Sequence, residues 1–230
     1  MRSTTIAVTG VGAITALGAD SESLWAGLCR GQRGFRRIEG FDTQGCRVDF
    51  GAEVHSATPR GARARALACR ASTEALGQSR LSRAELGQTG LVLGSTAAGD
   101  HLLEAQLGRV RRRGRERSSD LCLLGYPKRT LVDSVARALG LGGPRSSVNT
   151  ACSSGLVAII TGADWLCAGL CEAVVAGGVD PLTRYTLSGF CALRAVDPEP
   201  CRPFDRNRRG MSLGEGARRR TSGQTVSKLS

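Results

Sequence analysis

Along the chain, short apolar runs rich in β-branched residues alternate with longer segments whose apolar residues recur at helical spacing. Residues 6–8 form one such run, which ends in the turn Gly10-Val11-Gly12. Residues 20–28 then begin with Asp20 and Ser21, which suit a helix N-terminus, and continue with an apolar stripe. This order predicts a strand, a tight turn and a capped helix.

The same alternation continues through residue 178. Helices are predicted over residues 62–76, in a short turn capped by Ser82, over 131–139, and from behind Cys152 through Leu170, and strands over 90–94, 146–150 and 173–178. Residues 31–56 are glycine-rich and are predicted to be irregular. This rhythm predicts an α/β layered domain, with a mostly parallel sheet and helices on both of its faces.

The first glycine turn raises the question of a nucleotide site. In the dinucleotide-binding pattern G-x-G-x-x-G, the third glycine would fall on Thr15. Because the pattern fails there, we interpret Gly10-Val11-Gly12 as a tight turn and expect no cofactor.

The number and distribution of charged residues indicate which kinds of partner the chain could bind. The net charge is +12, from 32 basic and 20 acidic residues, and all but two of the basic residues are arginine. Residues 109–117 carry six Arg and one Glu, and residues 218–230 carry three Arg and one Lys with no acidic residue. No aromatic residue interleaves with the first cluster for base stacking, so we interpret it as a solvated loop and expect no nucleic acid. A basic nucleic-acid binder and a partner of an acidic carrier protein stay open as alternatives.

The sequence lacks the patterns typical of membrane proteins, disulfide-rich proteins and metalloproteins. No apolar stretch approaches the roughly 20 residues of a membrane-spanning helix, and the N-terminus lacks a signal-peptide pattern, so we expect a cytoplasmic protein with no membrane partner. The nine cysteines include no CxxC pair, which favours reduced thiols. Cys167 and Cys171 lie four residues apart, but with only His55 and His101 available we expect two buried small hydrophobes and no metal site.

One cysteine occupies a position with chemical consequences. Cys152 falls between a predicted strand and the first turn of a buried helix, in the segment Asn149-Thr150-Ala151-Cys152-Ser153-Ser154-Gly155. At a helix N-terminus, the macrodipole and the free backbone N–H groups favour thiolate over thiol. The small neighbours leave room for an acyl group, and a backbone N–H beside the sulfur could stabilise an oxyanion. A structural cysteine at a strand-to-helix turn is the alternative interpretation.

Residues 148–155 resemble the active-site cysteine elbow of the β-ketoacyl-acyl carrier protein synthases. Other segments resemble the same family in the same order: Thr9-Gly10-Val11-Gly12, residues 139–144, residues 176–180, and the pair 201–206 with 213–217. The resemblance covers residues 5–217, which correspond to the N-terminal half of the family's enzyme.

The resemblance implies a thiolase-like layered fold, of which this chain holds the N-terminal half while the C-terminal half is absent. It implies acyl transfer from acyl carrier protein to Cys152, then decarboxylative condensation with a malonyl-carrier thioester, in fatty acid or polyketide and aryl-polyene chain elongation. It also implies a homodimer, or a heterodimer with another ketosynthase. Ala97 stands where the family often has a bulky aliphatic residue at the end of the acyl tunnel, so we expect a roomier tunnel for the substrate.

Two features depart from the family. Its two catalytic histidines and its phenylalanine gate lie in C-terminal motifs, and neither His55 nor His101 lies in such a motif. Residues 218–230 put Arg218-Arg219-Arg220 where an apolar core strand is expected, and burying unpaired guanidinium groups costs several kcal/mol per ion. We therefore predict a ketosynthase domain over residues 1–217 and a non-homologous basic tail over residues 218–230. That tail is expected to stay outside the core, as the product of a truncation or a frameshift.

Two hypotheses of function follow. The first is an incomplete ketosynthase that accepts an acyl group on Cys152 but does not condense on its own. The second is a non-catalytic partner subunit or gene remnant that associates with a complete ketosynthase. In both, the face that would meet the second half exposes apolar surface, which predicts association or poor solubility.

Overall fold

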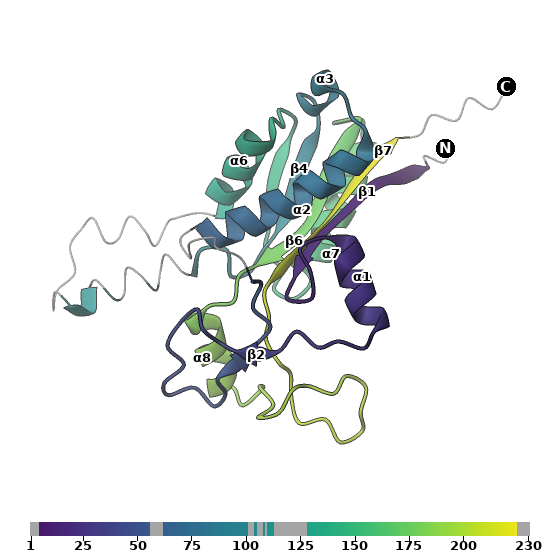
Figure 1. The fold of residues 1–230 in the computed structure, drawn as a ribbon. Helices are drawn as coiled ribbons and strands as arrows, with labels where there is room; N and C mark the ends of the chain where they lie inside the picture. Colours follow the sequence, from purple (N-terminus) through teal and green to yellow (C-terminus); the bar gives the residue numbers. More distant parts are fainter. Residues whose placement is uncertain are drawn as a thin grey trace.

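A computed structural model describes residues 5–55, 62–100, 104, 108, 110–112 and 128–224. Strands and helices alternate along most of it, as the sequence predicts (Figure 1). The elements are β1 (Ile6–Thr15), α1 (Ser21–Cys29), β2 (Arg36–Arg37), β3 (Phe50–Gly51), α2 (Arg63–Ser79), α3 (Arg83–Leu86), β4 (Gly90–Gly94), α6 (Lys128–Leu139), β5 (Arg145–Val148), α7 (Ser154–Cys167), β6 (Ala173–Asp180), α8 (Arg184–Ala192) and β7 (Gly216–Gln224).

Local signals in the sequence account for several element ends. Asp20 caps α1 by accepting a hydrogen bond from the Ser23 backbone N–H at 2.7 Å. Ser82 and Glu85 form a reciprocal capping box at the start of α3. The predicted strand over residues 90–94 coincides with β4. The two helix starts follow from side chains that satisfy nearby backbone groups. The tight turn predicted at Gly10-Val11-Gly12 is wrong, because β1 continues as a strand through Thr15 and its Gly10 and Gly12 pack against the backbone of α2.

The main sheet is mixed rather than mostly parallel. Its strand order is β1-β7-β6-β4-β5. β4 pairs in parallel with both β5 and β6, whereas β7 pairs antiparallel with both β1 and β6. The prediction of a mostly parallel sheet is therefore right for β4, β5 and β6 and wrong for β1 and β7.

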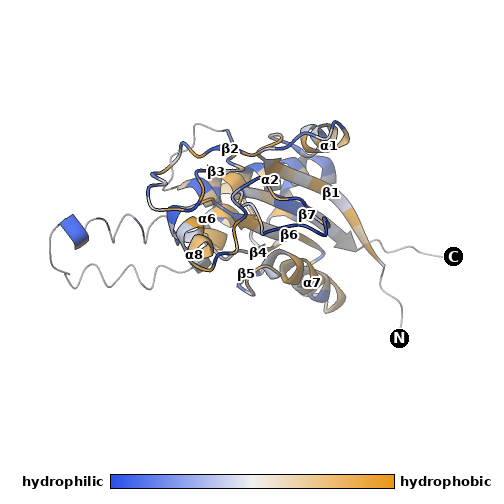
Figure 2. Cartoon of the chain, turned by 90° about the horizontal axis from the view of Figure 1, so that it is seen from below, coloured by the Kyte–Doolittle hydropathy of each residue, from blue (hydrophilic) through white to orange (hydrophobic). Residues whose placement is uncertain are grey.

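Helices cover both faces of the sheet, which confirms the predicted layers (Figure 2). The α2 and α6 face holds the larger core, which includes Leu67, Leu91 and Val175. The α7 face holds a smaller core around Val92, Leu166 and Val174. Among the described residues, no helix is both long enough and apolar enough to cross a membrane.

A small lobe below the sheet was not predicted. The residues expected to be irregular include β2 and β3, which pair antiparallel through Arg36 with Gly51 and Arg37 with Phe50. A third apolar cluster joins this hairpin to α8 through Ile38, Val48, Leu182, Leu187 and Val196. The lobe is assembled from residues that are far apart in sequence, so local periodicity does not reveal it.

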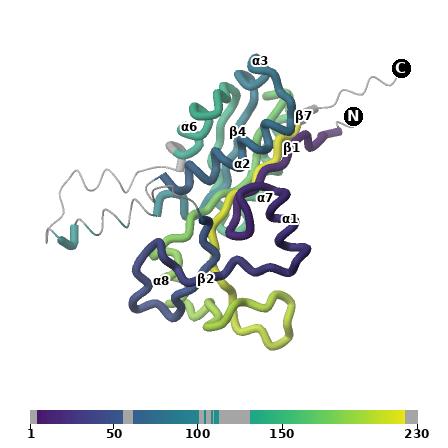
Figure 3. Tube along the Cα trace, in the orientation of Figure 1, coloured from purple at the N-terminus to yellow at the C-terminus, as the bar shows by residue number. Residues whose placement is uncertain are grey.

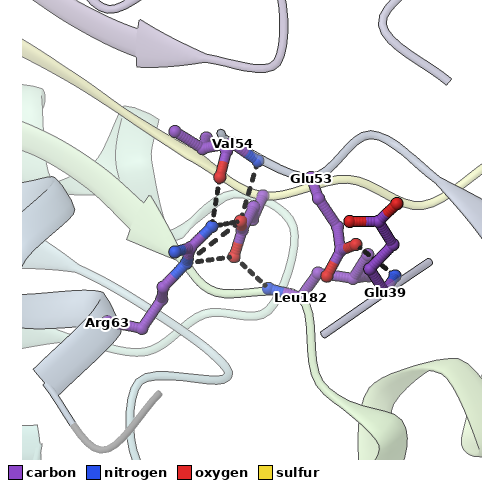
Figure 4. Close-up of polar contacts among 6 residues, drawn as sticks. Glu39, Glu53, Val54, Arg63 and Leu182 are labelled. Atoms are coloured by element: carbon purple, nitrogen blue, oxygen red, sulfur yellow. Dashed lines mark hydrogen bonds and ion pairs between the residues drawn. The ribbon is translucent and has the colours of Figure 1, made fainter. Parts of the chain in front are cut away.

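A buried ion pair ties this lobe to the sheet. The side chain of Glu215 is 2% exposed and pairs with the Arg63 guanidinium at the start of α2. The same carboxylate accepts backbone N–H bonds from Val54 at 2.8 Å and from Leu182 at 3.1 Å. Arg63 also donates to the Val54 carbonyl, so three separate segments converge on one carboxylate (Figure 4). Such a pair is well compensated because each partner is also hydrogen-bonded to the backbone.

The expectation that the basic segment stays outside the core is wrong for residues 218–224. They continue β7, an interior strand of the sheet that lies between β1 and β6. Figure 3 shows β1 and β7, from opposite ends of the chain, side by side. The strand forms because its backbone can pair on both sides, and this pairing does not depend on apolar side chains.

The position of β7 inside the sheet buries the side chain of Arg219, which is energetically unfavourable. Alternate residues of a strand face opposite sides, and Ala217, Arg219 and Thr221 are the buried ones. Arg219 pairs in register with Gly12 of β1 and Gly177 of β6, so both of its cross-strand neighbours lack a side chain. It is 0% exposed, and all three of its guanidinium nitrogens are buried with no hydrogen-bond partner. Burial lowers the pKa of Arg219 to about 9, and the nearby Cys69 opposes this shift only weakly.

We expect Arg219→Met to stabilise the protein. An unpaired buried guanidinium is replaced by an apolar side chain of similar length, and replacements of buried charges by apolar residues gain about 1–4 kcal/mol. For a chain of this size, that corresponds to a rise in Tm of roughly 2–4 °C per kcal/mol. Thermal unfolding followed by circular dichroism measures the shift.

The matched control is Arg220→Met, since Arg220 lies on the opposite face of the same strand and is half-buried. Its Tm should stay close to that of the unchanged chain. Burial keeps the folded pKa of Arg219 below its unfolded value, so the unfolded state holds more protons between about pH 9 and the unfolded pKa. The gain from Arg219→Met should therefore be fully present below pH 9 and shrink as the pH rises above it. An equal Tm for Arg219→Met and the unchanged chain at pH 7 would contradict this assignment.

Candidate active site

Cys152 lies on a tight elbow between β5 and α7, as predicted. The preceding residue, Ala151, has a left-handed φ of 52°, which is unfavourable for a residue with a side chain. The Ser154 backbone N–H donates to the Ala151 carbonyl at 3.0 Å, and the Ser154 hydroxyl donates to the same oxygen. The Thr150 backbone N–H donates in turn to the Ser154 hydroxyl at 2.9 Å. These bonds hold the elbow in its strained form, with Cys152 exposed at its tip.

Two glycines of the sheet set where α7 begins. A Cβ on Gly94, at the end of β4, would lie 2.2 Å from the Ser154 carbonyl oxygen. A Cβ on Gly178, in β6, would lie 3.2 Å from the Cα of Gly155. The first turn of α7 therefore rests directly on the backbone of two neighbouring strands. This contact places Cys152 above the end of the parallel part of the sheet.

The thiol opens into a cleft of about 350 Å³. Its walls come from α1, β1, β6, β7 and the elbow, and they include Leu24, Ala13, Val179, Arg218 and Cys152. Most lining residues are small or apolar, so the space can hold an aliphatic group next to the sulfur. The sequence does not predict that Arg218 lines the cleft, because residues 218–224 were not expected to form a strand.

Asp180 lies at the end of β6 and lines the same cleft. Its Oδ1 accepts hydrogen bonds from the Ser95 hydroxyl at 2.7 Å and from the backbone N–H groups of Thr96 at 2.9 Å and Ala97 at 2.7 Å. The carboxylate thereby fixes the loop behind β4. Thr96 also donates from its hydroxyl to the Ala151 carbonyl, at 3.2 Å, so the loop supports the elbow.

Ala97 itself is buried and is not among the residues that line the cleft. The structure therefore brings Ala97 near the site through its backbone bond to Asp180 and not through its side chain. Its predicted place at the end of an acyl tunnel stays a prediction.

The helix places Cys152 and Cys167 at its opposite ends. Cys152 precedes the first turn of α7, at the end of the helix where the first backbone N–H groups have no partner within the helix. Cys167 ends the same helix and is exposed, so the expectation that it is buried is wrong. Cys171 is buried, as expected, and its burial raises the pKa of that thiol.

The two histidines are not brought to this site within the described residues. His55 is exposed and its Nε2 contacts the Arg36 guanidinium in the lower lobe. His101 lies outside the described residues. In the part of the chain that the structure describes, no group of three or more His, Cys, Asp or Glu side chains is arranged to hold a metal ion.

We expect Gly94→Ala to displace the start of α7. The added methyl group would overlap the Ser154 carbonyl, and such overpacking costs about 1–3 kcal/mol. The variant should have a lower Tm, and its Cys152 should react more slowly with iodoacetamide than in the unchanged chain. Gly99→Ala is the control, because a Cβ there meets nothing within 4 Å. If Tm fell equally in both variants, the contact between Gly94 and α7 would not explain the loss of stability in Gly94→Ala.

Comparison with known proteins relates this chain to β-ketoacyl synthases and similar proteins. The family model "Beta-ketoacyl synthase, N-terminal domain" matches residues 3–218. Nodulation protein E of Rhizobium sp. (strain N33) is 29% identical over 224 residues, and 3-oxoacyl-[acyl-carrier-protein] synthase 2 of Vibrio harveyi is 32% identical over 235 residues. Each alignment covers 92% of this chain and 56% of the relative, so the chain spans little more than half the length of these proteins.

The fold agrees with this relationship. The solved structure of the ishigamide ketosynthase/chain length factor superposes with a TM-score of 0.87 at 26% identity, covering 98% of this chain and 60% of the other. A β-ketoacyl synthase from Burkholderia phymatum STM815 superposes with a TM-score of 0.79 at 24% identity, covering 97% of this chain and 60% of the other. The predicted thiolase-like fold of the N-terminal half is thus confirmed. The chain belongs to the β-ketoacyl synthase family, of which it contains the N-terminal domain.

Proposed function

We propose that this chain is an acyltransferase of the ketosynthase type that accepts an acyl group on Cys152. The observation that carries this proposal is the position of the thiol: exposed, on a strained elbow before α7, and open to a cleft of about 350 Å³. A purely structural cysteine needs neither a cleft nor a left-handed residue beside it. The family relationship supports the same reaction.

The acyl-transfer step uses only groups that the site holds. The Cys152 sulfur attacks the carbonyl carbon of an acyl thioester and forms a new C–S bond. The old C–S bond breaks, and the leaving thiolate takes up the proton that Cys152 has lost. Negative charge that develops near the sulfur is stabilised by the N-terminal end of α7.

We assign this chain the acylation step and not the condensation. Among the described residues that line the cleft, the only ionisable side chains are those of Cys152, Asp180 and Arg218. Three donors from the loop behind β4 bind Oδ1 of Asp180, so we assign this carboxylate the role of positioning that loop and not that of a general base. Decarboxylative condensation needs further groups than these, so we expect no elongated product from residues 1–230 alone.

The acyl donor we propose is an acyl carrier protein. The name of the Vibrio harveyi relative includes this partner, and the present chain has a net charge of +12, which suits an acidic protein. Charge of this size accelerates association with an oppositely charged partner, and salt screens the effect.

Mass spectrometry after incubation with an acyl-carrier thioester tests the acylation step. We expect one acyl group per chain, located on Cys152, and no acylation of Cys152→Ala. Cys167→Ala is the matched control, because that thiol is also exposed but lies at the opposite end of α7. Labelling that persists in Cys152→Ala, or that falls equally in Cys167→Ala, would exclude the proposed acyl site.

A second candidate function is that of a partner subunit that associates with a complete ketosynthase. It is favoured by the outer face of α7, where Leu156 is 63% exposed and Ile160 is 50% exposed, one helical turn apart. Apolar side chains exposed together in this way are typical of an interface. In another solved structure of this fold, a ketosynthase is in complex with its chain length factor.

Size-exclusion chromatography with light scattering tests this second role. We expect the purified chain to associate with itself or to co-elute with a full-length ketosynthase when the two are expressed together. Leu156→Gln with Ile160→Gln should weaken that association without loss of helix content. A monodisperse monomer that binds no ketosynthase would contradict the subunit role.

A further inference from the structure

Arg218 brings a positive charge into the cleft of Cys152. It is the third residue of β7, and it faces the opposite side of the strand from the buried Arg219. Arg218 is exposed and lines the cleft together with Cys152. In the sheet it lies between Ala13 of β1 and Gly178 of β6, two small residues that leave its side chain uncovered.

No carboxylate in the described part of the cleft forms an ion pair with this guanidinium group. Asp180 is the other charged side chain of the lining, and its Oδ1 already accepts three hydrogen bonds from residues 95–97. None of the ion pairs found among the described residues includes Arg218. The guanidinium group therefore has donors available for a molecule that enters the cleft.

We propose that Arg218 makes this cleft selective for acyl groups that carry a terminal carboxylate. A guanidinium group binds a carboxylate through two parallel N–H bonds, which an uncharged chain end cannot form. The proposal rests on the acyl transfer to Cys152 proposed above and adds the class of acyl group. Because Arg218 is exposed, solvent screens it, and we expect a preference of about threefold to tenfold.

Arg220 provides the matched control. It lies two residues further along β7 on the same face, opposite Val11 and Ala176, and it does not line the cleft. Replacing either arginine by Gln removes the same charge from the same strand. Only the loss of Arg218 should change the chemistry at Cys152.

The first measurement compares the alkylation rates of Cys152 by iodoacetate and by iodoacetamide, read by peptide mass spectrometry. The two reagents differ in charge and react at the same carbon, so their rate ratio reports on attraction of an anion. We expect this ratio to fall about threefold to tenfold in Arg218→Gln, to fall less in Arg218→Lys, which keeps the charge but not the two parallel donors, and to be unchanged in Arg220→Gln. A lower rate for both reagents with an unchanged ratio would mean that Arg218 acts on the sulfur alone, and would overturn the proposal.

The second measurement uses acyl thioesters of N-acetylcysteamine, which has no phosphate and so removes the other source of an anion on a carrier. The glutaryl and pentanoyl thioesters have acyl chains of equal carbon number and differ in a terminal carboxylate. We expect the unchanged chain to prefer the glutaryl group, and Arg218→Gln to lose that preference.

The outcomes separate the two proposals. If both thioesters acylate Cys152 at equal rates, the carboxylate selectivity is wrong while acyl transfer stands. If neither thioester acylates Cys152, both acyl transfer and acyl selectivity are wrong, although a ratio of alkylation rates that depends on Arg218 would still establish an anion-binding role. If Arg220→Gln changes the ratios as much as Arg218→Gln, general surface charge explains the effect and the local role of Arg218 is excluded.

Discussion

The close approach of α7 to the sheet is the constraint on which the candidate site depends. Gly94 and Gly178 lack side chains where the helix begins, so the backbone of Ser154 and Gly155 rests on the strands themselves. A helix seated this closely can be reached from β5 only through a sharp elbow, and Ala151 takes a left-handed conformation to make it. Cys152 is exposed because it lies at the tip of that elbow. The exposure of the thiol therefore depends on the lack of side chains at Gly94 and Gly178.

A second constraint acts from below the sheet. Glu215 collects Arg63, the Val54 backbone and the Leu182 backbone at one point, and β7 starts at the next residue. The lower lobe, the N-terminus of α2 and the first residues of β7 are thereby held together. Since Gly216, Ala217 and Arg218 line the cleft, this buried carboxylate also determines where one wall of the site lies. Polar contacts distant from the thiol thus shape the space beside it.

The strand β7 combines favourable backbone pairing with unfavourable side chains. Its backbone is hydrogen-bonded to β1 and β6, whereas Arg219 is buried with no partner. The same alternation that buries Arg219 exposes Arg218 on the cleft face. One run of three arginines therefore has two opposite consequences, a loss of stability on the α2 face and a positive charge at the site on the α7 face. Which arginine is buried and which is exposed depends on the register of β7, because a shift by one residue would turn each side chain to the opposite face of the sheet.

The amino-acid sequence alone predicts the elements that have local signals and the cysteine at the centre of the site. Capped helices, the apolar strand at residues 90–94 and the strand-to-helix position of Cys152 can be recognised because neighbours in sequence satisfy one another's backbone groups or share a buried face. The antiparallel insertion of β7, the Arg63–Glu215 pair and the exposure of Cys167 depend on tertiary contacts. Residues 218–224 show no apolar alternation, so only the strands on either side, which need partners for their own N–H and C=O groups, place them in the sheet. Such pairings join residues up to 218 positions apart, and no local pattern along the chain encodes them.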